Sequence, residues 1–481
     1  MFELLNMLSL LPEKLWNRYT AAHLLNRAGF GGTPDEIASL QSAGTKGAVE
    51  SLLKPDDDED LFPVPFLLQP KDRFVYRQRI QAASTEGEKR AIRQELNLAE
   101  RPSMIDLRVW WLNRMRYTSA PLQEKATLFW HGHFATSNQK VNDPYLMWQQ
   151  NETLRHYALG KFPDLLKAMS RDPAMIRWLD LESSHKGHPN ENFAREVMEL
   201  FSLGEGHYRE EDIQEAARAF TGYRIDQETG YFRDAPRDWD SGEKYFFGQM
   251  GDFTGDQIID LIVARPECAR FIGRKLWVFF VSDNPSEEII NCVADLLLNS
   301  GYDIGGTLRV IFQSTLFYES SVMHHQIKSP VQWLIQTTKI LEIPLPDDRV
   351  IENALSSLGQ ILFAPPNVKG WDGGRSWISA SSLLYRYNLA AYLLSGKAHI
   401  SGGGGTKTAL LPLQRIAPSA DRFESALLLD PLVFRLFNSH ISMKERGDFL
   451  TFLQNHSTPY TDNVIRDLLQ IMMGTPEYQL C

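Results

Sequence analysis

Cysteine is scarce in this sequence. Only Cys268, Cys292 and Cys481 occur among 481 residues, and none of them stands in a C-x-x-C spacing. So few cysteines do not form a disulfide framework, and single thiols do not predict a thiolate metal site. The thiols favour a reducing compartment, so a soluble protein in the cytoplasm is the simplest expectation.

Positive charge is also in short supply. The chain has 50 lysines and arginines against 60 aspartates and glutamates, which gives a formal net charge of −10. Nucleic-acid binding needs a concentrated basic surface that displaces counterions. We therefore expect no nucleic acid among the partners of this protein.

Long apolar runs and nucleotide-binding motifs are missing too. No run reaches the roughly 18 residues that a membrane-spanning helix needs. The N-terminal stretch MFELLNMLSLLPEKLWNRY has neither a basic start nor a small-residue cleavage site, which favours an amphipathic helix over a signal peptide. GFGG at 29–32 does not follow a predicted strand, and GGGGTK at 402–407 lacks the spacing of a phosphate-binding loop. These patterns predict no transmembrane segment and no nucleotide cofactor.

Helical patterns, by contrast, fill most of the chain. Thr33-Pro34-Asp35-Glu36 has the order of a capping box with a first-turn proline, and Pro121 predicts another helix start. We expect the long pattern from Asp72 to about Met115 to be interrupted near Arg101-Pro102. Further helices are expected over 145–159, 163–170, 190–203, 210–220, 255–264, 266–281, 286–299, 305–316 and 330–342.

One region has the pattern of strands. FTGYRID and YFRD alternate aromatic and polar residues around the turn QETG, and KYFFG offers a third short strand. We therefore expect a mainly α fold, a large multi-helix body with one small β-hairpin insertion near residues 219–248. Residues 1–400 are expected to form a single large helical domain. Residues 401–481 are expected to form a glycine-rich loop and a helical C-terminal section packed on the same body.

The segment Trp130-His131-Gly132-His133-Phe134 is the first candidate for a functional site. On a continuous helix, His131 and His133 would point to nearly opposite faces, but Gly132 favours a non-helical turn. In such a turn both imidazoles can bind one metal ion, with a carboxylate from elsewhere. The alternative is a helix end whose histidines hydrogen-bond backbone carbonyls.

The segment from Asn190 to Phe201 predicts a strongly amphipathic helix, with Asn190 as its N-cap. Beside its apolar stripe stand Asn190, Glu191, Asn192, Arg195, Glu196 and Glu199. In one interpretation these side chains form surface ion pairs, each worth a few tenths of a kcal/mol. In the other, Glu196 and Glu199 face a cleft as metal ligands or as a general acid and base.

A third candidate is the stretch Pro365 to Trp377, which holds two tryptophans, two prolines and three glycines. This composition predicts a rigid, aromatic-lined loop, and such loops often carry recognition. The alternative is a loop folded over the core with a tryptophan as its plug. The candidate substrate-binding residues are Asn190, Asn192, Asn367, Lys369 and Trp371.

Several segments, in this order, resemble the bacterial family catalogued as domain of unknown function 1800. They are His23 to Gly31, Trp130 to Phe134, Asn190 to Glu196, Glu199 to Gly204, Thr221-Gly222, Ala269 to Phe271, Ser329-Pro330 and Pro365 to Trp371. The resemblance runs from about residue 18 to about residue 400, or on to the end of the sequence, and implies a mostly helical fold. Family members are often exported and often encoded beside a sulfatase-like protein. The resemblance therefore implies export as an alternative location and a sulfatase-like protein as a partner.

The leading hypothesis is a metal-dependent enzyme, either a hydrolase or an oxidoreductase. Its divalent metal would be held by His131, His133, Glu196 and Glu199, and its catalytic residues would be Glu196, Glu199 and Arg195. Asn190, Asn192 and Arg195 would orient the ligands or hold an anionic substrate group. His23 and Arg27 share one helical face and are expected to support the site from behind.

Two rival hypotheses remain open. In the first, the protein is a non-catalytic binding or assembly protein. Its polar helix is then a structural ion-pair network, and the loop around Trp371 contacts a partner. In the second, a metal-free carboxylate enzyme acts on a polysaccharide, with some of the 11 tryptophans stacking on sugars.

Overall fold

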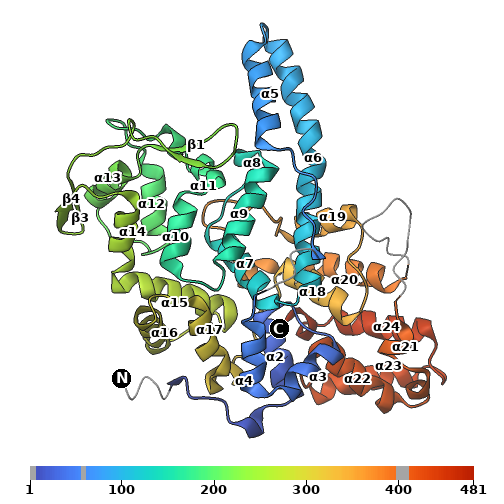
Figure 1. The fold of residues 1–481 in the computed structure, drawn as a ribbon. Helices are drawn as coiled ribbons and strands as arrows, with labels where there is room; N and C mark the ends of the chain where they lie inside the picture. Colours follow the sequence, from blue (N-terminus) through green and yellow to red (C-terminus); the bar gives the residue numbers. More distant parts are fainter. Residues whose placement is uncertain (1–6, 56–60, 397–410) are drawn as a thin grey trace.

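The protein is mainly α-helical, with two short two-stranded antiparallel sheets (Figure 1). The computed structural model describes residues 7–55, 61–396 and 411–481. The prediction of a mainly α fold is confirmed. None of the helices in these ranges is both long and apolar enough to cross a lipid bilayer.

The N-terminal part is helical and begins with clear capping signals. Its helices are η1 (Glu13–Leu15), α2 (Arg18–Ala28), α3 (Pro34–Ser42), α4 (Gly44–Leu52), α5 (Pro70–Ala82) and α6 (Glu86–Tyr117). The predicted capping box of α3 is confirmed. The Thr33 hydroxyl accepts the N–H of Glu36 at 3.2 Å, and the Glu36 carboxylate accepts the N–H of Thr33 at 2.6 Å.

Helix α6 is continuous through Pro102, so the predicted interruption at Arg101-Pro102 is wrong. The chain turns earlier, between α5 and α6, where Thr85 caps α6 through the N–H of Glu88. The two helices form a hairpin that stands out from the body (Figure 1). A proline inside a helix costs about 3 kcal/mol. The contacts of α6 with α7, α9, α18 and α19 offset that cost.

The middle of the chain contains seven helices, of which α7 carries the two histidines. They are α7 (Pro121–His133), α8 (Asn138–Val141), α9 (Pro144–His156), α10 (Phe162–Ser170), α11 (Pro173–Trp178), α12 (Glu191–Glu199) and α13 (Glu210–Ala219), with the short η3 (Leu181–Ser183) before α12. Helices α7, α9 and α11 each begin with proline, which lacks the N–H that would be unsatisfied at this position.

The strand region contains two hairpins where one was predicted. Strands β1 (Tyr223–Ile225) and β2 (Phe232–Asp234) pair around the predicted QETG turn. The segment KYFFG does supply a strand, β3 (Lys244–Phe246), but it pairs with β4 (Gln249–Gly251) and not with the first hairpin.

The remainder of the chain is again helical. It comprises α14 (Gly255–Val263), α15 (Pro266–Phe280), α16 (Glu287–Asn299), α17 (Ile304–Gln313), η4 (Thr315–Tyr318), α18 (Pro330–Ile340), α19 (Asp348–Leu358), η5 (Gly374–Trp377), α20 (Ala380–Leu394), α21 (Leu413–Ile416), η6 (Ser419–Phe423), α22 (Ser425–Phe437), α23 (Met443–Gln454), α24 (Asp462–Met473) and η7 (Glu477–Gln479). The glycine-rich stretch 399–407 lies outside the described residues.

Two hydrophobic cores meet at α7. The first core contains Phe129 and Trp130 of α7 together with residues of α2, α4 and α10 to α17. The second contains Leu128 of α7 together with residues of α6 and of α18 to α24. Helix α7 therefore stands between the two halves of the fold, and its C-terminal end carries the predicted histidines.

Candidate functional site

The two histidines at the end of α7 bind two different backbone segments. The Nε2 atom of His131 accepts the backbone N–H of Phe363 at 3.0 Å. The Nε2 atom of His133 lies 3.0 Å from the carbonyl oxygen of Phe201 and donates to it. Burial lowers the pKa of both imidazoles to about 3, so both are neutral at physiological pH. Each histidine thus fastens one neighbouring segment to α7.

The bond from His131 supports a strained backbone. Phe363 has a φ of +61°, in the left-handed region that bulky residues rarely adopt. Its ring packs against the His131 ring with centroids 5.3 Å apart, and the ring of Trp371 lies 5.7 Å from His131 on another side. His131 therefore contacts both a residue just before the aromatic-lined loop and a tryptophan within it.

Gly132 does not break the helix, so the prediction of a non-helical turn is wrong. Helix α7 continues to His133, and the N–H of Phe134 still reaches the carbonyl of Trp130 at 2.8 Å. The glycine that is needed for space is Gly370 of the loop, not Gly132. A Cβ on Gly132 would meet no atom within 4 Å, while a Cβ on Gly370 would collide with the Gly132 carbonyl oxygen. The loop backbone at Gly370 thus rests directly on the backbone of α7.

The predicted metal ligands do not converge. His131 and His133 are occupied by separate backbone partners, as a helix end would have them. Among residues 7–55, 61–396 and 411–481, no three side chains of His, Cys, Asp or Glu lie close enough to hold a metal ion together. A metal at this place stays a prediction from the sequence pattern.

Asn190 and Asn192 form hydrogen bonds at the N-terminal end of α12. Asn190 is the N-cap of α12, as predicted, and its side-chain oxygen accepts the N–H of Asn192 at 3.0 Å. The Asn190 amide also donates to the Ser183 hydroxyl at 2.9 Å, and the Asn192 amide donates to the Leu179 carbonyl at 3.3 Å. These bonds give both asparagines a structural role.

Most charged side chains of α12 are also paired. Arg195 lies 3.5 Å from the Glu191 carboxylate and 2.5 Å from that of Glu210 on α13. The Tyr208 hydroxyl donates to Glu199 at 2.7 Å. The contacts of Arg195 with Glu191 and Glu210 are surface ion pairs of the kind that the first interpretation predicted.

Glu196 differs from its neighbours on α12. It is half-buried and makes no side-chain hydrogen bond or ion pair among the described residues. Burial and the nearby Glu199 raise its pKa, while Arg195 and Lys369 oppose this increase. Lys369 belongs to the aromatic-lined loop, so the structure brings this loop within electrostatic reach of Glu196.

A cavity of about 460 Å³ lies beside α7. Its lining includes Lys125, Phe129, Gly132 and His133 of α7, Lys275, Val278 and Phe279 of α15, the following Asp283, Gln326, Ser329, Gln332, Gln360, and Lys369, Trp371, Asp372 and Trp377 of the loop, together with Cys481. On α7 the lining residues recur at three- and four-residue spacing, so they form one face of the helix. This face, α15, the start of α18 and the loop enclose the cavity.

Lys125 is the buried cation of this cavity. Its residue surface is only 7% exposed, and its Nζ atom donates to the side-chain oxygen of Gln332. The ammonium group also lies 5.0 Å from the ring centroid of Phe30 and 5.6 Å from that of Phe279. No described carboxylate forms an ion pair with Lys125. Burial, and to a smaller extent Arg27, lowers the pKa of Lys125 to about 7, although Cys481 opposes the decrease.

The mouth of the cavity carries further charges. Lys275, Lys369, Asp283 and Asp372 are all exposed lining residues. The side chains that line the cavity thus include three lysines and two aspartates, and Lys125 is the most buried of these five.

Arg27 donates a hydrogen bond to a residue that lines the cavity, whereas His23 is not among the lining residues. The guanidinium of Arg27 donates to the carbonyls of Phe280 at 3.0 Å and Val281 at 3.2 Å, and to the side chain of Gln326. Gln326 is a lining residue. The Nε2 atom of His23 lies 3.1 Å from the carbonyl of Phe317, inside the first core.

Of the predicted substrate-binding residues, Lys369 and Trp371 line the cavity. Asn367 instead accepts the N–H of Lys369 at 2.9 Å and shapes the loop. Sequence reasoning missed Lys125 and Gln332. The available signal was the position of Lys125 three, four and seven residues before Leu128, Phe129 and Gly132, on the apolar side of a helix.

The comparison with protein families gives one match. The model of the family described as "Protein of unknown function (DUF1800)" matches residues 23–480, which confirms the predicted resemblance. Neither the curated proteins nor the solved structures contain a match.

Proposed function

The chain belongs to the DUF1800 family, whose description names no activity, and we propose from its own residues that the cavity beside α7 binds a small organic anion. The observation that carries this proposal is the buried Lys125, which has no carboxylate partner among the described residues. Burying an unpaired ammonium group is costly. A ligand with a carboxylate or a phosphate group offsets that cost by bringing negative charge into the same cavity.

The size and the walls of the cavity further restrict the ligand. A volume of about 460 Å³ suits a small molecule. Phe129, Phe279 and Trp371 provide aromatic surface, and Gln332 and Gln360 provide buried amide groups. Lys275 and Lys369 at the mouth attract an anion from solvent. The ligand we propose thus combines an anionic group with an apolar or flat part.

Calorimetric titration with pyruvate, 2-oxoglutarate and pyridoxal 5′-phosphate tests this proposal. We expect saturable binding of at least one of these anions to the wild-type chain. Lys125→Met should weaken that binding at least about tenfold, which corresponds to about 1.4 kcal/mol. Gly132→Leu should abolish it, because the new side chain points into the open space at Gly132.

Lys328→Met is the matched control for the binding test. Lys328 is also a buried lysine, but it donates to the carbonyl of Tyr478 at 2.7 Å and is not a lining residue. This variant should bind the anions as the wild type does. Equal binding by the wild type and by Gly132→Leu, or no binding of any of the three anions, contradicts the proposal.

A metal-dependent reaction is a second proposal, supported by the free carboxylate of Glu196. Elemental analysis of untagged protein, beside His131→Ala and Glu196→Ala, tests it. A stoichiometric metal in the wild type that both folded variants lack supports this proposal, and wild-type protein without metal contradicts it. The sulfatase-like partner likewise stays a prediction, which co-purification of the two proteins tests.

A further inference from the structure

We propose that Lys125 forms an imine with a carbonyl group of the anion in the cavity. This inference rests on the proposed anion-binding function and adds a reaction to it. The substrate class is then an anionic aldehyde or ketone, such as a 2-oxo acid or a phosphorylated aldehyde. Lys275 and Lys369 at the mouth are placed to attract the anionic group, and Lys125 acts on the carbonyl.

The surroundings of Lys125 suit a nucleophilic amine. Its Nζ atom is held by a neutral amide, that of Gln332, and by the faces of two aromatic rings. A carboxylate partner would keep the amine protonated and therefore unreactive, and no described carboxylate takes this position. A lysine desolvated in an apolar pocket is a recognised form of activated nucleophile.

The protonation state agrees with this geometry. An ordinary lysine, with a pKa of about 10.4, is unprotonated in roughly one molecule in a thousand near neutral pH. Burial lowers the pKa of Lys125 to about 7, so a large fraction of its amine is free at the same pH.

The proposed step balances without an oxidant or a reductant. The amine lone pair of Lys125 attacks the carbonyl carbon and forms a C–N bond, while the π electrons move to the oxygen. The oxygen takes a proton from nitrogen, which gives a carbinolamine. The C–O bond then breaks as the nitrogen lone pair forms the C=N bond, and the oxygen leaves as water with a second proton, which comes from solvent and replaces the one that the ammonium group released on becoming the free amine. The net change converts a carbonyl group and an ammonium group to a protonated imine and water.

Lys328 provides a control inside the same chain. It is 2% exposed, and burial lowers its pKa to about 7, as for Lys125. Its Nζ atom donates to the carbonyl of Tyr478 at 2.7 Å, 4.2 Å from the ring centroid of that residue, and lies outside the cavity lining. If a lowered pKa alone determined reactivity, both lysines would react. If access from the cavity is also needed, only Lys125 reacts.

Reductive trapping tests the inference on the full-length chain. The protein is incubated near neutral pH with pyruvate, 2-oxoglutarate or pyridoxal 5′-phosphate and with sodium cyanoborohydride, which reduces an imine to a stable secondary amine. Peptide mass spectrometry then locates the modified lysines. With at least one probe, we expect modification of Lys125 at least about tenfold faster than that of Lys328 and of exposed lysines.

Two variants and one analogue complete the test. Lys125→Arg should lose the adduct, and Gly132→Leu, which keeps the lysine, should lose it as well. Lactate replaces the carbonyl of pyruvate by a hydroxyl, so it should bind without forming an adduct. Saturable anion binding with an unmodified Lys125 overturns the imine but leaves the proposed function standing. Equal labelling of Lys125 and Lys328 also overturns the imine, and absence of any anion binding overturns both proposals.

Discussion

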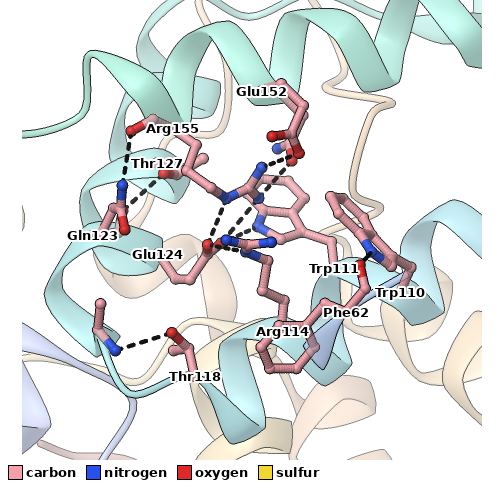
Figure 2. A network of polar contacts seen from close by, with 12 residues as sticks. Phe62, Trp110, Trp111, Arg114, Thr118, Gln123, Glu124, Thr127, Glu152 and Arg155 are labelled. Carbon is pink, nitrogen blue, oxygen red and sulfur yellow. Dashed lines mark hydrogen bonds and ion pairs between the residues drawn. The ribbon is translucent and has the colours of Figure 1, made fainter. Parts of the chain in front are cut away.

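Glu124 and Lys125 are neighbours on α7, both are buried and charged, and their surroundings are opposite. Glu124 is 1% exposed and accepts hydrogen bonds from Arg114 at 2.7 Å, Arg155 at 2.5 Å and Trp111 at 2.8 Å (Figure 2). Burial alone would raise the pKa of Glu124, yet Arg155 and Arg114 hold it below its ordinary value. This carboxylate is fully paired within the protein.

Lys125 has no such set of partners. Successive residues on a helix point about 100° apart, so it faces a different direction and meets one neutral amide, that of Gln332. The comparison teaches that burial of a charge does not by itself indicate function. A buried charge with all its partners in the chain fixes the fold, and one that lacks a partner beside a cavity indicates a ligand.

The largest expected effect is on the paired side of α7. Glu124→Gln removes the charge that Arg114 and Arg155 share, so both buried guanidinium groups lose their common carboxylate partner. We expect the free energy of unfolding to fall by roughly 3 to 5 kcal/mol. Urea denaturation followed by circular dichroism measures the change.

Glu152→Gln is the control for that variant. Glu152 pairs with the same Arg155 at 2.5 Å, but its side chain is 39% exposed. In this variant the free energy of unfolding should fall by less than about 1 kcal/mol. If the free energy of unfolding fell by similar amounts in the two variants, the buried pairing of Glu124 with Arg114 and Arg155 would not have the stabilising role described.

Lys125→Met should change stability in a pH-dependent manner. The pKa of Lys125 is about 7 in the folded state, whereas the ordinary lysine pKa of about 10.5 applies to the unfolded chain. Between these values the unfolded chain binds the proton and the folded chain does not. The wild type therefore gains stability as pH rises through this window, and below it the full cost of burying the ammonium is present.

The variant lacks this titrating group. Relative to Lys125→Met, the free energy of unfolding of the wild type should increase by about 1 kcal/mol per pH unit between about pH 7 and pH 9. Urea denaturation of both proteins at several pH values measures the gain. A difference in unfolding free energy between the two proteins that stays constant across this window would contradict the lowered pKa of Lys125. Because Lys328 has a similarly lowered pKa, Lys328→Met should show the same pH dependence of stability without affecting anion binding.

The smallest expected effect concerns the cavity-facing glycine. Gly132→Ala places a methyl group where no atom lies within 4 Å and removes the flexibility of glycine from a helix. We expect a gain of about 0.5 kcal/mol in the free energy of unfolding. Thermal unfolding detects it, and a loss of stability would indicate that Gly132 has a tightly packed surrounding.

Local sequence rules predicted much of the helical fold. The capping box at Thr33 and the N-cap at Asn190 are confirmed because they depend on residues within one turn. Pro102 and Gly132 gave wrong predictions because packing decided the outcome. Contacts with other helices keep α6 continuous through its proline, and α7 stays helical through Gly132, while the close approach to the loop depends on Gly370.

The candidate site was predictable in part. The composition of the loop pointed to Lys369 and Trp371, and both line the cavity. Lys125 was missed because a lysine on a helix usually lies in solvent. Its spacing on α7 places it on the apolar side of the helix, but the rings of Phe30 and Phe279 that cover its amine come from distant parts of the chain, and the spacing does not reveal them.

The contact between Gly370 and Gly132 makes the width of the cavity a property of the main chain. The wall that carries Lys369 and Trp371 is set against α7 with no side chain between the two backbones. Rotation of a side chain therefore cannot widen or narrow this junction. The lining residues can be exchanged to alter ligand preference while the frame keeps its dimensions, so this junction is a natural starting point for redesigning the cavity.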